Sequence, residues 1–176
     1  MIRITGGKYR SRLLTTPSGI LTKPTMDKVR AAVFSALSND KLDNVLDLFA
    51  GSGLYGFESL SRGAKHVYFV DKSRDAINAI KENALKLGAD NIDICQNDAL
   101  SFLRDCAEQF DVIFVDPPYK LDVYEDITKL ILEKNLLTDN GILVLESEKE
   151  LNINVEQFSK TKYYKYGLAK IYILRK

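Results

Sequence analysis

Several residue types are scarce in this chain of 176 residues. It has no tryptophan, one histidine (His66) and two cysteines (Cys95 and Cys106). Their spacing matches neither a zinc site nor a disulfide framework, so we expect buried thiols and no metal. No apolar run approaches the ~20 residues that span a membrane, and no segment resembles a secretion signal. We therefore expect a cytoplasmic protein without a membrane segment.

The charges are distributed unevenly along the chain. The net charge is only +1, but the first 38 residues carry seven basic side chains and one acid, Asp27. The remaining residues therefore have a net charge of −5. The length fits one domain with one core. We predict a single domain over residues 1–176, with a basic segment (1–38) for a polyanion and a core (39–176) for cofactor and catalysis.

The first twelve residues predict a short strand (Met1–Thr5), a glycine turn and a second short strand (Lys8–Arg12). Cations interleaved with apolar side chains suit single-stranded or looped nucleic acid, because phosphate contacts position the strand and stacking adds affinity. A solvated edge hairpin, whose charges prevent aggregation, is the alternative. The candidate RNA-binding residues are Lys8, Arg10, Arg12, Lys23, Lys28 and Arg30.

A helix is predicted from about Met26 to about Ser38. Thr25 is a suitable N-cap, and apolar residues recur at the helical period on one face. Lys28 and Arg30 fall on its other faces, so we expect them to extend the basic surface.

From Asn44 onward, buried strands alternate with amphipathic helices. This order predicts right-handed βαβ units and a parallel sheet. The predicted strands are Val45–Leu48, His66–Val70, Asn91–Cys95, Phe110–Val115 and Gly141–Leu145, and the predicted helices are Leu54–Arg62, Arg74–Leu87, Ala99–Ala107 and Val123–Glu133. Two further strands, Lys162–Tyr166 and Lys170–Leu174, predict an antiparallel edge pair. The expected fold is α/β, a Rossmann-like, doubly wound and mostly parallel sheet.

A complete Gly-x-Gly-x-x-Gly motif (Gly51, Gly53, Gly56) follows the first strand of the core and opens a predicted helix. Such glycines allow a tight turn and a close approach of the backbone to a ligand. Asp71 ends the next strand, 20 residues after Gly51, where an acid can bind ribose hydroxyls. This context predicts a cofactor that contains adenosine.

Asp47 favours S-adenosylmethionine over a dinucleotide. A carboxylate just before the glycine turn would repel a pyrophosphate, but it can pair with the ammonium group of a methionine moiety. Asn97 and Asp98 could bind the adenine amine. Each acid also has a simpler interpretation, as a turn residue or a helix N-cap. The candidate cofactor-binding residues are Asp47, Phe49, Gly51, Gly53, Asp71, Lys72, Asn97, Asp98 and Thr25.

The segment Asp116-Pro117-Pro118-Tyr119 ends the strand Phe110–Val115. Two prolines cannot donate ladder hydrogen bonds, so the strand stops and leaves a carboxylate at its carboxyl end, where ligands bind in open α/β sheets. This group suits methylation of an exocyclic amine on a nucleobase. Asp116 and a proline carbonyl would accept the two N–H bonds, and Tyr119 would stack on the base. A rigid turn without catalysis is the alternative.

These motifs together resemble the RsmD family of bacterial methyltransferases, which methylates N2 of a guanine in 16S rRNA. The resemblance rests on the following segments: Gly6–Arg12, Thr22–Thr25, Asp27–Arg30, Asp47–Gly53, Leu60–Ala64 and Asp116–Tyr119. It implies that S-adenosylmethionine is the cofactor, that Thr22–Thr25 folds over its site, and that the basic hairpin meets the rRNA. Because the chain is short and its basic arm has only seven cations, we expect the substrate to be rRNA in an assembling small subunit, where ribosomal proteins aid recognition. A monomer is expected. The family usually has Arg at Lys23 and Lys28, and a small residue at Tyr55.

Four other functions remain open from the sequence. A DNA methyltransferase acting on adenine N6 or cytosine N4 could use the same Asp116 site. A protein-glutamine methyltransferase would carry Asn where Asp116 stands. A nicotinamide oxidoreductase would explain the glycine motif, but neither the prolines nor the basic segment. A non-catalytic RNA-binding module would need no intact donor pocket.

Overall fold

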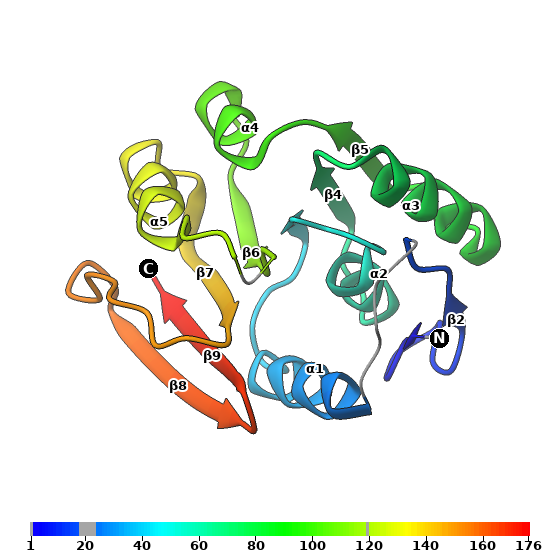
Figure 1. The fold of residues 1–176 in the computed structure, drawn as a ribbon, viewed down its shortest axis with the longest axis horizontal. Helices are drawn as coiled ribbons and strands as arrows, with labels where there is room; N and C mark the ends of the chain where they lie inside the picture. Colours follow the sequence, from blue (N-terminus) through cyan, green and yellow to red (C-terminus); the bar gives the residue numbers. More distant parts are fainter. Residues whose placement is uncertain (1, 18–23, 119) are drawn as a thin grey trace.

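The computed structural model describes residues 2–17, 24–118 and 120–176, with only the backbone of residues 24–26. Within these ranges, seven strands form one sheet in the order β5-β4-β3-β6-β7-β9-β8 (Figure 1). They are β3 (Asn44–Leu48), β4 (His66–Asp71), β5 (Ile92–Gln96), β6 (Phe110–Val115), β7 (Leu137–Ser147), β8 (Lys160–Tyr166) and β9 (Ala169–Arg175). Strands β3 to β7 run parallel, whereas β9 is antiparallel to both β7 and β8. The predicted α/β fold is confirmed.

Helices cover both faces of this sheet (Figure 1). On one face, α1 (Pro24–Ala36), α2 (Leu54–Ser61) and α3 (Arg74–Leu87) contribute to one hydrophobic core. On the other face, α4 (Ala99–Asp105) and α5 (Tyr124–Glu133) contribute to a second core. Every residue of β6 is buried, as expected for a central strand of a parallel sheet. We call the two sides the α1 face and the α5 face.

Most predicted boundaries agree closely with the structure. The spans predicted for β6 and α3 match residue for residue. Helix α1 begins at Pro24, two residues earlier than predicted, because proline fits the first helical turn, where its missing N–H costs nothing. Strand β7 is longer than Gly141–Leu145, because Leu137 also pairs with Phe110 across a register shift.

The N-terminal prediction needs one correction. The second short strand does not lie within Lys8–Arg12, because residues 6–11 form a bend and turns. It is β2 (Leu13–Leu14), which pairs with β1 (Ile2–Arg3). Gly7 and Ser11 have positive φ values of 74° and 68°, and such residues turn a chain rather than extend it.

The N-terminal hairpin docks on α2. Thr5 donates two hydrogen bonds of 2.7 Å to Glu58, one from its backbone N and one from its hydroxyl group. The backbone N of Tyr9 donates to the hydroxyl of Ser61 at 2.8 Å. A Cβ on Gly7 would lie 1.7 Å from the backbone oxygen of Ser61, so only glycine allows this approach. These contacts fix the basic hairpin on the α1 face.

His66 and the two cysteines differ in burial: His66 and Cys95 are half-buried, so the expectation of two buried thiols holds only for Cys106. The His66 ring lies 2.9 Å from Asp93, and both thiols are free, with Cys106 buried. Across the described part of the chain, no cluster of three or more His, Cys, Asp or Glu could hold a metal ion. None of the helices in the described ranges is long and apolar enough to cross a bilayer.

Candidate active site

Three acids meet at the carboxyl edge of the sheet. Asp47 lies in β3, which is flanked by β4 and β6; Asp71 is the last residue of β4, and Asp116 follows β6. Because these strands are parallel neighbours, their carboxyl ends form one continuous edge (Figure 1). The structure therefore brings together the predicted cofactor acids and the predicted catalytic acid, as the general rule for open α/β sheets requires.

The turn after β3 depends on backbone conformations that favour glycine. Phe49, Gly51 and Gly53 have φ values of 65°, 55° and 77°. A Cβ on Gly53 would also lie 2.6 Å from the Phe57 ring, so a side chain there would be both strained and crowded. A Cβ on Gly51 would meet only the Phe49 oxygen, at 4.0 Å. The Gly51 backbone is therefore accessible to a ligand.

Asp71 ties the glycine turn to the end of β4. Its carboxylate accepts hydrogen bonds from Gly51 N at 2.9 Å and from Ser73 N at 2.8 Å. Ser73, not Asp71, is the N-cap of α3, because its hydroxyl accepts from Ala76 N. The alternative interpretation of Asp71 as an N-cap is therefore wrong. Lys72, between the two, is exposed.

Asp47 is a buried acid with a raised pKa. Its side chain is 3% exposed, and its carboxylate accepts one hydrogen bond, at 2.8 Å, from Gly56 N. Burial raises the pKa of Asp47 to about 8, the Gly56 bond opposes the rise, and the charge of Asp71 adds to it. A cationic group beside the carboxylate would reverse much of this cost. The donor set thus fits the ammonium group that the sequence predicted for it.

The two predicted adenine-binding residues after β5 differ in their contacts. Asp98 caps α4, since one carboxylate oxygen accepts from Leu100 N at 3.1 Å and from Ser101 N at 3.2 Å. The simpler interpretation of Asp98 as a helix N-cap is therefore confirmed. Asn97 is half-buried, and its side-chain oxygen accepts from Asp98 N at 2.8 Å. Phe49 is also half-buried and packs against the core of the α5 face.

Asp116 lies one residue beyond the pair formed by Val115 and Leu145, opposite Glu146 of β7. Burial, followed by the charges of Glu146 and Asp47, raises the pKa of Asp116 well above its usual range. Pro117 is buried and Pro118 is exposed. The Pro118 carbonyl accepts a hydrogen bond from Leu121 N at 2.8 Å, so it is already engaged within the chain.

Two tyrosines that the sequence did not single out hold Glu146, the neighbour of Asp116. The hydroxyl of Tyr55 donates to Glu146 Oε2 at 2.6 Å, and its ring stacks on Phe114 with centroids 4.7 Å apart. The hydroxyl of Tyr124 donates to the backbone oxygen of Glu146 at 2.7 Å. Glu146 could have been suspected as another acid near a strand end, but its tyrosine partners lie far from it in the sequence.

The predicted RNA-binding residues are divided between surface and interior. Lys8, Arg10, Arg12 and Lys28 are exposed. Arg30 is only 2% exposed and pairs with Glu58 at 3.3 Å and with Asp27 at 2.9 Å. The prediction that Arg30 extends the basic surface is therefore wrong, because the buried carboxylate of Glu58 requires a buried cation. Lys23, Tyr119 and the side chain of Thr25 lie outside the described residues.

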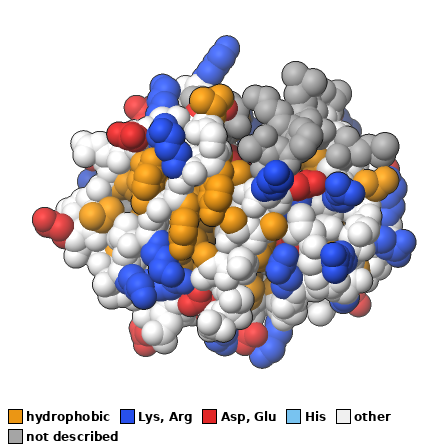
Figure 2. Space-filling model, turned by 90° about the horizontal axis from the view of Figure 1, so that it is seen from below, with side chains coloured by type: hydrophobic (Ala, Val, Ile, Leu, Met, Phe, Trp, Pro, Cys, Tyr) orange, Lys and Arg blue, Asp and Glu red, His pale blue; other side chains and the backbone are white. Residues whose placement is uncertain are grey.

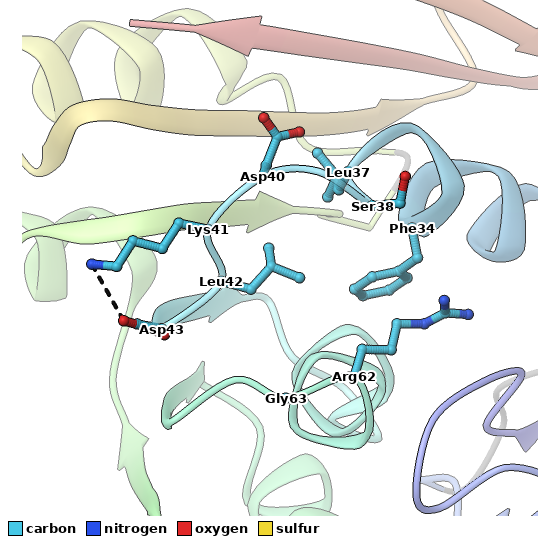
Figure 3. Close-up of a pocket in the computed structure, with 9 residues that line it drawn as sticks. All are labelled: Phe34, Leu37, Ser38, Asp40, Lys41, Leu42, Asp43, Arg62 and Gly63. Carbon is cyan, nitrogen blue, oxygen red and sulfur yellow. Dashed lines mark ion pairs between the residues drawn. The ribbon is translucent and has the colours of Figure 1, made fainter.

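In the described part of the chain, two of the hollows lie at opposite edges of the sheet. One, of about 430 Å³, lies at the opposite, amino edge of the sheet, between the end of α1 and the turn after α2. Figure 3 shows Phe34 and Leu42 reaching into it, whereas Lys41 turns toward Asp43, its ion-pair partner at 3.4 Å. The other, of about 280 Å³, lies between the start of α5 and residues 147–153, beside the carboxyl edge. Only the second adjoins the candidate active site.

Comparison with known proteins gives consistent results. A family described as conserved hypothetical protein 95 matches residues 2–175. Ribosomal RNA small subunit methyltransferase D of Escherichia coli is 35% identical over 150 residues, which cover 85% of this chain and 76% of the relative. A solved E. coli structure, provisionally named methyltransferase yhhF, superposes with a TM-score of 0.89 at 31% identity and covers 99% of this chain and 97% of its own.

A more distant structure shows the fold alone. The Thermus thermophilus 16S rRNA N2 G1207 methyltransferase RsmC, solved with AdoMet and guanosine, has a TM-score of 0.70 at 20% identity. The match covers 90% of this chain and 44% of that one. The Rossmann-like arrangement predicted from the sequence is therefore shared with a methyltransferase domain.

Proposed function

This chain belongs to the family of the ribosomal RNA small subunit methyltransferase D proteins, the RsmD family, and we propose that it methylates N2 of a guanine in 16S rRNA with S-adenosylmethionine as donor. The observation that carries the proposal is the position of Asp116, beside Asp47 at adjacent strand ends. One strand end can hold the methyl donor while its neighbour holds the acceptor amine. No metal is required.

The donor would lie along the carboxyl ends of β3, β4 and β5. Asp47 would pair with its ammonium group, the Gly51 backbone would face it closely, and Asp71 and Asn97 would bind its ribose and adenine. When bound, S-adenosylmethionine supplies an electrophilic methyl group. Asp71 accepts hydrogen bonds from both Gly51 and Ser73, so the glycine turn is preorganised.

The chain's own contribution to the reaction is to position the acceptor. The N2 lone pair of guanine is delocalised into the ring, so the amine is a weak nucleophile. Asp116 and the Pro117 carbonyl would accept its two N–H bonds and turn the lone pair toward the methyl carbon. As the new C–N bond forms and the S–C bond breaks, the methylated nitrogen would carry one proton too many, and the carboxylate form of Asp116 would accept it. The raised pKa makes this carboxylate a stronger base than an exposed aspartate.

The RNA would approach from the α1 face. The exposed Lys8, Arg10 and Arg12 lie on the hairpin fixed to α2, and the Lys8 ammonium lies 4.6 Å from the Tyr9 ring centroid. The target guanine must leave its stack to reach Asp116, at a cost of a few kcal/mol. An assembling small subunit in the cytoplasm would present that base, and the protein would act as a monomer. Lys23 and Lys28 would contact phosphate as point charges rather than as planar forks.

The test is transfer of labelled methyl from S-adenosylmethionine to small-subunit particles that lack the modification, followed by nucleoside analysis. We expect N2-methylguanosine. Protein-free 16S rRNA, run in parallel, separates a particle substrate from naked rRNA, and equal activity on both would contradict the need for ribosomal proteins.

Three controls address the alternatives. Duplex DNA containing adenine and cytosine serves as a competing substrate, and labelled N6-methyladenine without labelled RNA would overturn the substrate assignment. Titration with NADH, followed by fluorescence, tests the dehydrogenase alternative. RNA binding without any binding of S-adenosylmethionine by calorimetry would favour a non-catalytic RNA-binding module.

A further inference from the structure

The C-terminal hairpin has a composition that the proposed chemistry does not use. Residues 160–176 contain six cations, no acid and four tyrosines. The cations are Lys160, Lys162, Lys165, Lys170, Arg175 and Lys176, and the tyrosines are Tyr163, Tyr164, Tyr166 and Tyr172. Interleaved cations and aromatic rings are typical of surfaces that bind single-stranded nucleic acid. Strand β8 also forms one edge of the sheet, next to β9.

The strand registers place one face of β8 in line with the catalytic acid. Asp116 lies opposite Glu146, since Val115 pairs with Leu145; Glu146 in turn pairs with Ile171, and Ile171 with Tyr164. Residues in one such row point to the same face of a sheet, and three strand spacings amount to about 14 Å. Tyr164 therefore shares the α1 face with Asp116, within the reach of a few nucleotides.

Tyr166 lies further toward the carboxyl edge on the same face. The rings of Tyr164 and Tyr166 are nearly parallel, with an interplanar angle of 18° and centroids 6.3 Å apart. Both side chains are partly buried and pack against the core of the α1 face, which restricts their rotation. The turn beyond them ends in Leu168, which is 67% exposed. The rings thus form a preorganised platform at the site's edge of the sheet.

Lysines extend this platform along the strand. Lys160 and Lys162 alternate with Thr161 in β8, so they share the face of Tyr164 and Tyr166. Figure 2 shows the molecule from below, with hydrophobic side chains gathered between Lys and Arg side chains on the side where β8 and β9 lie. A second group of basic side chains occupies the other side of this view.

Near the carboxyl edge of the sheet, the α5 face is acidic, in contrast to the basic side chains of β8. The hollow of about 280 Å³ is lined by four acids, Asp122, Glu125, Glu148 and Glu150, and by one lysine, Lys149. Phosphates would be repelled there. Charge complementarity therefore directs an RNA strand toward the α1 face, on which the lysines and tyrosines of β8 lie.

We propose that Lys160, Lys162, Tyr164 and Tyr166 of β8 form a second RNA-binding surface, which holds the single-stranded nucleotides beside the target guanine. The tyrosines stack on bases and the lysines contact phosphates. The proposal rests on the proposed function, because it names the surface that would position that substrate. The strand would then be held on both sides of Asp116, by the N-terminal hairpin and by β8.

The test uses the full-length protein and the small-subunit particle. Tyr164→Leu combined with Tyr166→Leu removes both rings but keeps apolar side chains, and we expect KM to rise at least about fivefold with kcat unchanged. Tyr164→Phe combined with Tyr166→Phe keeps the rings and should preserve KM. Lys160→Gln combined with Lys162→Gln should lower the slope of log K against log salt for RNA binding by about 1.4.

Matched controls make the outcomes distinct. Arg104→Gln combined with Lys129→Gln removes two exposed cations from α4 and α5 on the α5 face, and should change neither KM nor the salt slope. Calorimetry of S-adenosylmethionine binding and a thermal melt check that each variant is folded. Unchanged KM and salt slope in the β8 variants would overturn the proposal and leave these side chains as protection of an edge strand. A lower kcat at constant KM would also overturn it. Failure of the wild-type protein to methylate RNA would refute the proposed function instead.

Discussion

The hydroxyl of Tyr55 donates a 2.6 Å hydrogen bond to Glu146, although 91 residues separate them in the sequence. Tyr55 belongs to the helix that follows the glycine turn, and Glu146 belongs to the strand beside Asp116. The bond therefore links the proposed cofactor turn to the proposed catalytic acid. Burial and the nearby charges of Glu146 and Asp116 raise the pKa of Tyr55 well above 10, so its hydroxyl stays a donor.

Tyr55→Phe should destabilise the protein. The variant keeps the ring that stacks on Phe114 but leaves the Glu146 carboxylate, which is 8% exposed, without this donor. Loss of a buried hydrogen-bond partner costs about 1–3 kcal/mol. Urea denaturation measures the change, and Tyr55→Leu should cost more because it also loses the stacking. A Tyr55→Phe protein as stable as the wild type would contradict this role.

Asp116→Asn should lower kcat for methyl transfer at least about 100-fold, because the amide cannot accept the substrate proton and aligns the amine poorly. The substitution preserves size, so binding of S-adenosylmethionine by calorimetry should remain close to that of the wild type. Asp116→Ala should behave in the same way. Loss of cofactor binding in both variants would instead make Asp116 a structural residue.

Cofactor binding should release a proton near pH 7. Asp47 has a pKa of about 8 in the protein, so it is mostly protonated at pH 7, and a neighbouring ammonium group favours the carboxylate and lowers this pKa. Affinity should therefore increase as the pH rises toward 8. Calorimetry in buffers of different ionisation enthalpy counts the released protons. Asp47→Asn should bind more weakly and release none from this position; identical release by both proteins would refute the assignment.

Asp47 should also make the protein less stable as the pH rises. Its folded pKa is raised to about 8, above its unfolded value, so the unfolded chain loses this proton first as the pH rises. The contribution of Asp47 to the free energy of unfolding is therefore most favourable below the unfolded pKa, and it is lost progressively up to about pH 8. Urea denaturation at pH 5 and pH 8 should show a steeper fall for the wild type than for Asp47→Asn. Equal slopes would contradict the raised pKa.

Arg30→Met should destabilise the fold by about 3–5 kcal/mol, because it leaves a buried carboxylate without one of its cations. That carboxylate, Glu58, is fully buried and also pairs with Arg62 at 2.8 Å. Lys28→Gln is the matched control, since Lys28 is exposed two residues away on the same helix, and should change stability by no more than about 0.5 kcal/mol. Preserved stability of Arg30→Met with weaker RNA binding would restore Arg30 as an RNA contact.

The sequence by itself determined the α/β fold and the strand-end acids of the candidate site. Helix α3 and strand β6 were predicted without error because their patterns are local: each depends on hydrophobic period and on neighbouring cap or proline residues. The glycine turn is also local, since its φ values require residues that the sequence names directly.

Only the tertiary structure decided which charged side chains are buried and which residues of different strands lie side by side. Arg30 lies inside because Glu58, 28 residues away, needs a cation, and no periodic pattern encodes that pairing. Tyr55 meets Glu146, and Tyr164 shares a row with Asp116, only through the order and register of the strands. Contacts between distant segments depend on the packing of the whole chain, which is why local sequence could not reveal them.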